Sequence, residues 1–358
     1  MSELKQIVSL WHKAKERNEE VCLATVVRTE GSSYRKPGAR MLLTRSGQRA
    51  GTISGGCLEG EVTKKAWWLT ENGPVVQRYS SFFDEDSPMP YGLGCGGTVY
   101  VLLEREVSAH AVLDALQSGL EERRAFVVIT DTNTAQTLLV RQIDGRTLFS
   151  ADFGANDLFE HAVQNRRSFY SVSQPELFVE YIAPPPALTI FGAGDDAKPL
   201  SESAQQLGWH VTVADGRSHL ARPERFPAAN RVHTLDYESP ALLSGIELDP
   251  ANAYVLLTHS YEQDRALLRE LLPLAPRYLG ILGPRQRTER LVREIADATN
   301  LTPEECMGRL HAPIGFDIGA HSPEGVALSI VAEIFAVLNG REGLSLKKHA
   351  TTALSIHA

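Results

Sequence analysis

The chain has 358 residues, and at roughly 150 residues per domain this length predicts two or three domains. Hydrophobic residues make up 43% and charged residues 22% of the sequence, which excludes a disordered chain, a collagen-like repeat and a long coiled coil. The formal net charge is −8, from 36 basic and 44 acidic side chains, so nucleic acid is not expected as a partner. The first residues do not resemble a signal peptide, and no apolar run is long enough to span a membrane. We therefore expect a cytoplasmic protein with reduced cysteines that lies outside the membrane.

The four cysteines, Cys22, Cys57, Cys95 and Cys306, stand far apart in the sequence. They form no CxxC pair and no cluster with histidines, so the sequence predicts neither a disulfide scaffold nor a structural zinc site.

The first half predicts a mixture of helices and strands without a regular order. Apolar residues at helical spacing predict a first helix over residues 4–14, and strand-like runs follow at 21–27 and 39–44. A glycine-rich bend at 51–56 leads into a predicted helix over 57–69. The other predicted elements are a strand at 98–103, a helix at 108–118, a strand at 126–130, a hairpin near 144–145 and a strand at 177–182. This half is therefore expected to be an α+β domain.

Three consecutive prolines, Pro184 to Pro186, mark the boundary between the two halves, because they favour an extended segment and cannot continue a helix. We expect an N-terminal domain over 1–183, a linker over 184–187, a second domain over 188–345 and a tail over 346–358.

The second half alternates strand-like and helix-like segments. The predicted strands cover 188–191, 210–214, 253–258 and 278–282, and the predicted helices cover 197–207, 261–272 and 286–296. A last helix begins at Ser322, a good N-cap followed by proline. This alternation predicts a Rossmann-like, doubly wound parallel sheet with helices on both faces.

A glycine loop follows the first strand of that sheet. Gly192 permits a tight turn, Gly194 lets a pyrophosphate approach, and the next helix begins at Ala197. Asp215, at the end of the following strand, is placed to bond a ribose hydroxyl, and Arg217 would favour a phosphorylated ribose. The alternative is that the loop is only a packing turn.

Other polar residues are expected near the same edge of the sheet. His259, Asp264 and Arg285 follow later strands, and the carboxyl ends of parallel strands share one crevice. Asp317 lies between glycines in a segment bounded by His311 and His321, two residues that can carry protons near neutral pH. Each of these residues can instead belong to an ordinary loop.

Two glycine-embedded cysteines stand out in the first half. Cys57 follows Gly55 and Gly56 at the expected start of a helix, where free amides and the helix dipole favour a thiolate, with Glu59 close behind. Cys95 follows Gly94 in a second tight segment. These thiols are candidates for sulfur or metal chemistry, and the alternative is that each is a small buried residue.

A short basic segment lies between the first two strands. Arg35, Lys36 and Arg40 form a local positive patch in an acidic protein. This patch is a candidate site for a phosphate or an acidic partner. The alternative is that it is an ordinary solvated loop.

Several segments together carry a recognisable pattern. In the first half they are GSSYRKPGARM at 31–41, GTISGGCLE at 51–59 and GCGG at 94–97, and in the second half FGAG at 191–194, LGW at 207–209, GILG at 280–283 and GFDIGA at 315–320. With these motifs the chain resembles the XdhC/CoxI family, the accessory factors of xanthine dehydrogenase and carbon monoxide dehydrogenase. It departs from many relatives at Asp195, where they have histidine.

The resemblance implies a protein that binds molybdenum cofactor, assists its sulfuration by a cysteine desulfurase and delivers it to an apo-xanthine dehydrogenase-type molybdoenzyme. It also implies a homodimer, with Cys57, Cys95 and the Rossmann glycine loop as cofactor contacts. The alternatives are an NAD(P)-dependent oxidoreductase, in which His259, His311 or His321 is the proton donor, and a nucleotide-sensing module.

Overall fold

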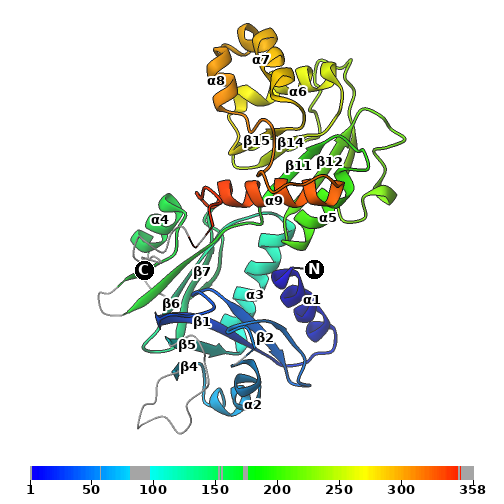
Figure 1. The fold of residues 1–358 in the computed structure, drawn as a ribbon. Coiled ribbons are helices and arrows are strands. Elements are labelled where there is room, and N and C mark those ends of the chain that lie inside the picture. Colours follow the sequence, from blue (N-terminus) through cyan, green and yellow to red (C-terminus); the bar gives the residue numbers. More distant parts are fainter. Residues whose placement is uncertain are drawn as a thin grey trace. The chain divides into compact units, whose positions relative to one another are not determined.

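The computed structural model describes residues 2–56, 58–80, 97–151, 154, 156–171, 176–345 and 347, without the side chain of Glu106. The chain forms two compact units, Met1–Pro185 and Pro186–Ala358, which we describe separately (Figure 1).

In the part of the N-terminal unit that the structure describes, the strands form two antiparallel sheets of five strands each. The first has the order β3-β2-β1-β5-β4 and the second has the order β8-β7-β6-β10-β9. The strands of the first are β1 (Val21–Gly31), β2 (Arg40–Thr44), β3 (Arg49–Gly51), β4 (Val75–Ser80) and β5 (Gly97–Glu104). Those of the second are β6 (Phe126–Asp131), β7 (Gln136–Gln142), β8 (Thr147–Ser150), β9 (Phe169–Ser171) and β10 (Leu177–Ile182). The expected α+β class is confirmed, and the sequence did not predict β3, β4 or β9.

Four helices of the described residues pack on these sheets: α1 (Glu3–Glu16), α2 (Glu59–Leu69), α3 (Glu106–Glu121) and α4 (Asn156–Asn165). The apolar stripe of α1 is buried with α3 against side chains of both sheets, among them Leu23 and Phe126. A separate cluster buries α2 on β1, β2 and β5. The apolar face that the sequence predicts for the first helix therefore faces the sheets.

The C-terminal unit contains a parallel sheet with the order β13-β12-β11-β14-β15. Its strands are β11 (Ala187–Phe191), β12 (His210–Asp215), β13 (Arg231–Thr234), β14 (Ala253–Leu256) and β15 (Tyr278–Ile281). In chain order this is the 3-2-1-4-5 arrangement of a Rossmann fold, which confirms the prediction. The sequence missed β13, a short polar edge strand, and placed Ala187 in the linker although it begins β11.

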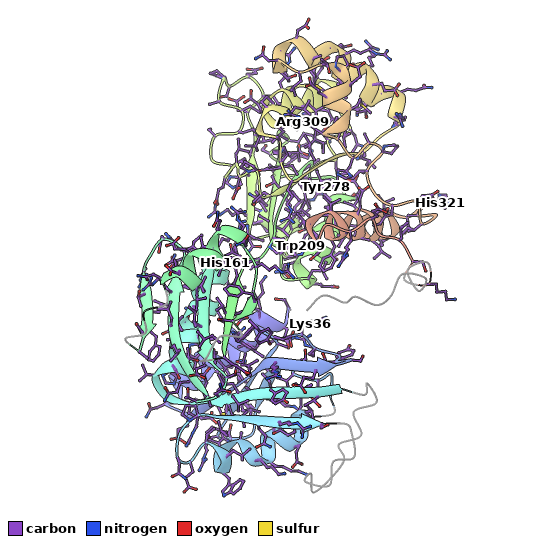
Figure 2. All side chains as sticks on the ribbon, turned by 90° about the vertical axis from the view of Figure 1, so that its left-hand side faces the viewer. Lys36, His161, Trp209, Tyr278, Arg309 and His321 are labelled. Carbon is purple, nitrogen blue, oxygen red and sulfur yellow. The ribbon has the colours of Figure 1, made fainter. Side chains whose placement is uncertain are left out.

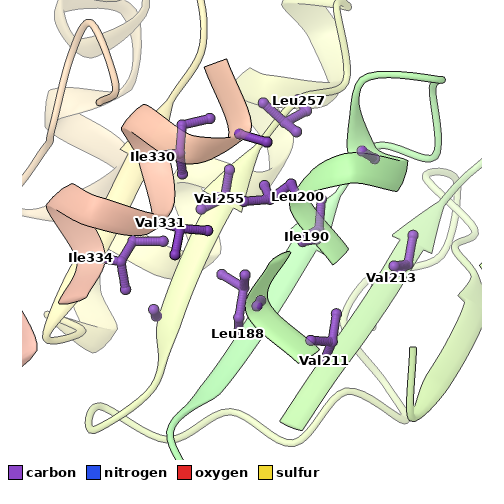
Figure 3. Packing of buried hydrophobic residues seen from close by; sticks show 14 of the residues in the cluster. Leu188, Ile190, Leu200, Val211, Val213, Val255, Leu257, Ile330, Val331 and Ile334 are labelled. Carbon is purple, nitrogen blue, oxygen red and sulfur yellow. The ribbon is translucent and has the colours of Figure 1, made fainter. Parts of the chain in front are cut away.

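Helices cover both faces of the parallel sheet. α5 (Ala197–Gln206) and α9 (Pro323–Leu338) pack on one face, where Leu188 and Ile190 of β11 meet Leu200 and Ile330 (Figure 3). α6 (Tyr261–Leu274), α7 (Arg285–Thr299) and α8 (Pro303–Gly308) cover the other face. As predicted, Ser322 is the N-cap of α9, and its Oγ accepts a hydrogen bond from the Gly325 amide at 3.2 Å.

Among the residues that the structure describes, no helix combines the length and apolar character needed to span a membrane. The same residues include no group of three or more His, Cys, Asp or Glu side chains arranged to hold a metal ion.

Candidate functional site

The first and third motifs of the N-terminal half meet in the first sheet. Gly31, at the end of β1, pairs with Gly97, at the start of β5. A Cβ atom on Gly97 would lie 2.1 Å from the carbonyl oxygen of Ser32, so only glycine permits this approach. The end of the GCGG motif is therefore held against the GSSYRKPGARM segment.

The same GSSYRKPGARM segment also contacts the second motif. The ring of Tyr34 lies against Gly55, where an added Cβ would be 2.7 Å from the ring atom Cε1. Gly55 and Gly56 have φ values of +86° and +124°, which other residues rarely adopt. The fold thus brings three separated motifs of the N-terminal half to one place. The candidate residues Cys57, Gly94 and Cys95 lie outside the described residues.

Glu59 anchors the loop that leads to Cys57. Its side chain is buried at the start of α2 and turns back toward the loop. Oε1 accepts hydrogen bonds from the amides of Ile53 at 3.0 Å and Ser54 at 2.9 Å, while Oε2 accepts from Ser54 Oγ at 2.6 Å and from the Gly56 amide at 2.9 Å. Ser54 Oγ in turn accepts from the Leu58 amide at 2.8 Å. The carboxylate therefore fixes the backbone on both sides of position 57.

The charge of Glu59 is strongly favoured in this setting. Burial alone raises the pKa of a carboxyl group, but the hydrogen bonds from Ser54 and Ile53 outweigh it and lower the pKa of Glu59 to about 2. The sequence placed Glu59 near the thiol but gave no sign that its carboxylate binds the loop amides.

The predicted basic patch is divided among three environments, and the prediction was wrong for Arg40. Its guanidinium forms a two-pronged ion pair with Glu180 of β10, with Nη1 and Oε1 2.8 Å apart and only 7% and 9% of the side chains exposed. Arg35 pairs with Glu3, whose other oxygen accepts from the Thr52 amide at 2.7 Å. Of the three cations, Lys36 alone is exposed at the surface (Figure 2).

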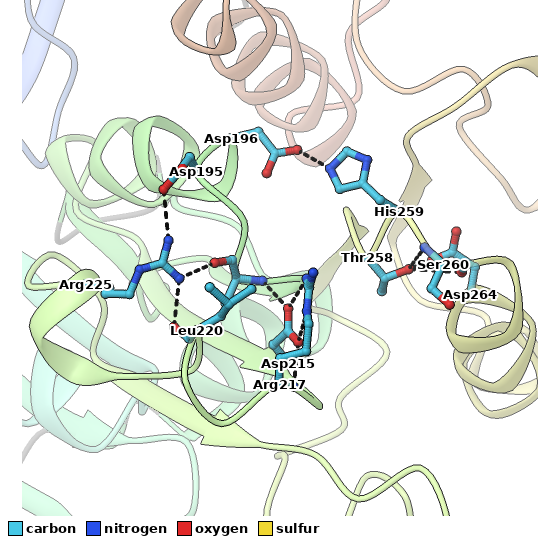
Figure 4. Close-up of polar contacts among 11 residues, drawn as sticks. Asp195, Asp196, Asp215, Arg217, Leu220, Arg225, Thr258, His259, Ser260 and Asp264 are labelled. Carbon is cyan, nitrogen blue, oxygen red and sulfur yellow. Dashed lines mark hydrogen bonds and ion pairs between the residues drawn. The ribbon is translucent and has the colours of Figure 1, made fainter.

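In the C-terminal unit, Asp215 organises the glycine loop from the end of β12 (Figure 4). Its Oδ2 accepts from the Ala193 amide at 2.7 Å and from Arg217 Nη2 at 2.7 Å. Its Oδ1 accepts from the Arg217 amide at 2.8 Å and from Nε at 2.9 Å. All four acceptor sites of this buried carboxylate are thus used inside the protein. Burial raises the pKa of Asp215, and the bonds from Arg217 and Ala193 outweigh it, so the net shift is downward.

Close packing and a second arginine hold the rest of the loop. A Cβ atom on Gly192 would lie 2.2 Å from the carbonyl oxygen of Leu257, just beyond β14, so the residue must be glycine. Arg225 donates to the Ala193 carbonyl at 2.8 Å and to Asp195 at 2.9 Å. A Cβ atom on Gly194 would lie 2.6 Å from Oδ1 of Asp196. The loop is therefore fixed by internal contacts.

The carboxyl edge of the sheet is bridged where the strand order reverses, between β11 and β14. Asp196, the N-cap residue of α5, and His259, after β14, are joined by a contact of 2.7 Å between Oδ2 and Nε2 (Figure 4). His259 has a φ value of +58°. The structure thus brings His259 to the glycine loop, as the sequence suggested, but in contact with an acidic side chain.

Asp264 and Arg285 do not join this group. Asp264 is buried, accepts from Thr258 Oγ1 at 2.6 Å and pairs with Arg287 at 2.7 Å, so it ties α6 to α7. Burial raises the pKa of Asp264, and its two partners only partly offset this. Arg285 is exposed and pairs with Glu289 of its own helix at 3.0 Å.

The segment between α8 and α9 has a half-buried beginning and an exposed end. His311 stacks on Tyr278, with ring centroids 4.3 Å apart, and its Nδ1 lies 3.4 Å from Glu333 of α9. Tyr278 and the Gly315 amide also donate to Glu333. Asp317 is exposed, and so is His321, which Figure 2 labels. Among the described residues, His311 is therefore the histidine of this segment that joins the cluster around Glu333.

Comparison with known proteins agrees with the motifs in both halves. The family model described as the XdhC and CoxI family matches residues 14–80, and the model described as the XdhC Rossmann domain matches residues 188–334. A Bacillus subtilis protein, named as a probable xanthine dehydrogenase component, is 32% identical, and the alignment covers 89% of this chain and 93% of that protein.

Two further relatives cover nearly the whole chain. The Escherichia coli protein named molybdenum cofactor insertion chaperone PaoD is 25% identical over 88% of this chain and 82% of its own length. A crystal structure from Bacillus halodurans, titled as a xanthine dehydrogenase, is 29% identical, with a TM-score of 0.75 and coverage of 94% of this chain and 97% of that one. With both of its halves matched, the chain belongs to the XdhC and CoxI family.

Proposed function

We propose that this chain is an accessory factor in molybdenum cofactor maturation. In this proposal it binds the cofactor as cargo through the N-terminal unit and delivers it to an apo-xanthine dehydrogenase-type molybdoenzyme. The observation that carries the proposal is the meeting of the three N-terminal motifs around Tyr34 and Gly55. The names of the B. subtilis and E. coli relatives, which refer to xanthine dehydrogenase and to cofactor insertion, point in the same direction.

The described residues of this region fit part of the cargo. Apart from its chain neighbours, no described atom lies within 4 Å of the point where a Cβ on Gly56 would be, so among the described residues a ligand can approach the backbone there. The amides of Ile53, Ser54 and Gly56 are already bonded to Glu59, so they are not available to hold the phosphate of a molybdopterin. Lys36 is the exposed cation of the GSSYRKPGARM segment, and it is a better phosphate partner than these loop amides.

The finer parts of the proposal concern sulfur transfer and assembly. The thiols of Cys57 and Cys95 are the groups that would contact the metal end of the cofactor while a cysteine desulfurase supplies sulfur. We further propose that the protein acts as a homodimer in the cytoplasm, where the molybdoenzyme receives its cofactor.

The rival function, an NAD(P)-dependent oxidoreductase, needs a dinucleotide on the Rossmann loop. In the usual arrangement the pyrophosphate lies at the start of the first helix and an acidic side chain after the second strand bonds the ribose. Here the start of α5 carries the Asp196–His259 pair, and every acceptor site of Asp215 is used. The residues as arranged do not fit a dinucleotide, so we derive no step through it.

The proposal predicts selective binding. We expect the purified full chain to bind molybdenum cofactor, released anaerobically from a purified molybdoenzyme, and to transfer it to apo-xanthine dehydrogenase, whose gain of activity is measured. NADH and NADPH, titrated under the same conditions and followed by nicotinamide fluorescence, are expected not to bind. Tight NAD(P)H binding with hydride transfer, and no uptake of the pterin, would contradict the proposal.

A further inference from the structure

Tyr34 is exposed in a way that packing does not explain. Its side chain is 75% exposed, the largest value among the exposed large apolar side chains of the described residues. An aromatic ring gains stability when its faces are covered. Gly55 lies against this ring and has no side chain to cover it. Tyr34 nevertheless lies where the N-terminal motifs meet, beside the loop that Glu59 holds rigid.

The surroundings of the ring limit how a ligand can be held there. The loop amides beside it are used by Glu59, and the guanidinium of Arg35 is used by Glu3. At Gly56, next to Gly55, no described atom other than those of the chain neighbours lies within 4 Å of the point where a Cβ would be. A ligand in this position therefore gains most by covering the flat face of the ring, and the chemistry that does this best is a planar heteroaromatic group.

We propose that Tyr34 is a stacking platform for the pterin ring of molybdenum cofactor. This inference rests on the function proposed above and adds the part of the cargo that is recognised and the residue that recognises it. The pyrimidine ring of a pterin offers a flat face comparable to that of a nucleobase, a group that proteins commonly bind by stacking on aromatic side chains. Gly55 is required because a larger residue would displace the ring.

The test is an anaerobic titration of the full chain with released molybdenum cofactor and, separately, with a metal-free pterin. We expect Tyr34→Ala to weaken the binding of both ligands about tenfold or more, because a stacked face is lost. Tyr34→Phe keeps the ring and is expected to stay within about twofold of the wild type. Because Tyr34 is exposed, neither variant should change the melting temperature.

Trp68 supplies a matched control in the same unit. It is 70% exposed and lies near the far end of α2, about 14 Å along the helix from Glu59. Trp68→Ala is expected to bind both ligands as the wild type does. If Tyr34→Ala binds the cofactor as tightly as the wild type does, Tyr34 is not a stacking platform, and the same holds if Tyr34→Phe loses as much affinity as Tyr34→Ala. In either case the proposed function of the chain still stands. If the wild type binds no cofactor, the proposed function and the platform are both overturned.

Discussion

Replacement of Glu59 by glutamine is expected to lower the free energy of unfolding of the N-terminal unit by about 3 kcal/mol and to abolish cofactor uptake. The carboxylate accepts four hydrogen bonds in a buried position, three of them from loop amides. A glutamine keeps one acceptor oxygen but turns an NH₂ group toward the Gly56 amide, which is itself a donor. The loop before Cys57 then loses its anchor.

Equilibrium denaturation with urea measures this loss, and Glu61→Gln is the matched control. Glu61 lies in the same helix, and its carboxylate pairs with Lys65 at 2.6 Å across one turn. Such a surface pair contributes under about 0.5 kcal/mol, so this variant should remain close to the wild type. Equal stability of the two variants would show that Glu59 does not hold the loop.

The pH dependence follows from the pKa of Glu59. Because that pKa falls from 4.5 to about 2 on folding, the charged form stabilises the folded state at every pH above about 4.5. This contribution is lost as the pH falls from 4.5 toward 2, since the unfolded chain then takes up the proton first. Glu59→Gln should therefore unfold with a weaker dependence on pH in this range than the wild type.

The second large effect is expected at Asp215 in the C-terminal unit. Asp215→Asn should lower the free energy of unfolding of that unit by about 3 kcal/mol. The variant leaves the guanidinium of Arg217 without its carboxylate and turns an amide NH₂ toward a donor, either the Ala193 amide or Arg217 itself. Hydrogen exchange of β11 measures the change locally.

Asp317→Asn is the control for Asp215, because Asp317 is exposed in the same unit and has no hydrogen-bond partner among the described residues. Its substitution should change stability by less than about 0.5 kcal/mol. If Asp215→Asn and Asp317→Asn have the same free energy of unfolding, the hydrogen bonds of Asp215 around the glycine loop do not stabilise the C-terminal unit.

The Rossmann half could be predicted well because its signals are local. Short apolar strands such as 188–191 are buried on both faces, and the turns between strands and helices carry glycine or a good N-cap. The miss at β13 has a physical reason, since an edge strand with the sequence RVHT buries little and has no apolar run. The sequence did not predict that Arg217 pairs with Asp215, because an arginine two positions along the chain can either fold back onto the carboxylate or extend away from it.

The N-terminal half was harder because its pairings join distant segments. β1 pairs with β5, more than 60 residues later, and β10 pairs with β6, about 50 residues earlier. No local pattern specifies such register, so the meeting of Ser32 with Gly97 and of Tyr34 with Gly55 could not be derived from spacing. Arg40 was misread for the same reason, since its partner Glu180 is 140 positions away.

Hydrogen–deuterium exchange of the full chain, with and without bound molybdenum cofactor, tests most directly whether the N-terminal motifs receive the cargo. The prediction is that bound cofactor slows exchange in residues 31–38 and 51–59. Slower exchange confined to the Rossmann loop, at residues 192–196 and 215–217, would contradict it and place the cargo in the other unit.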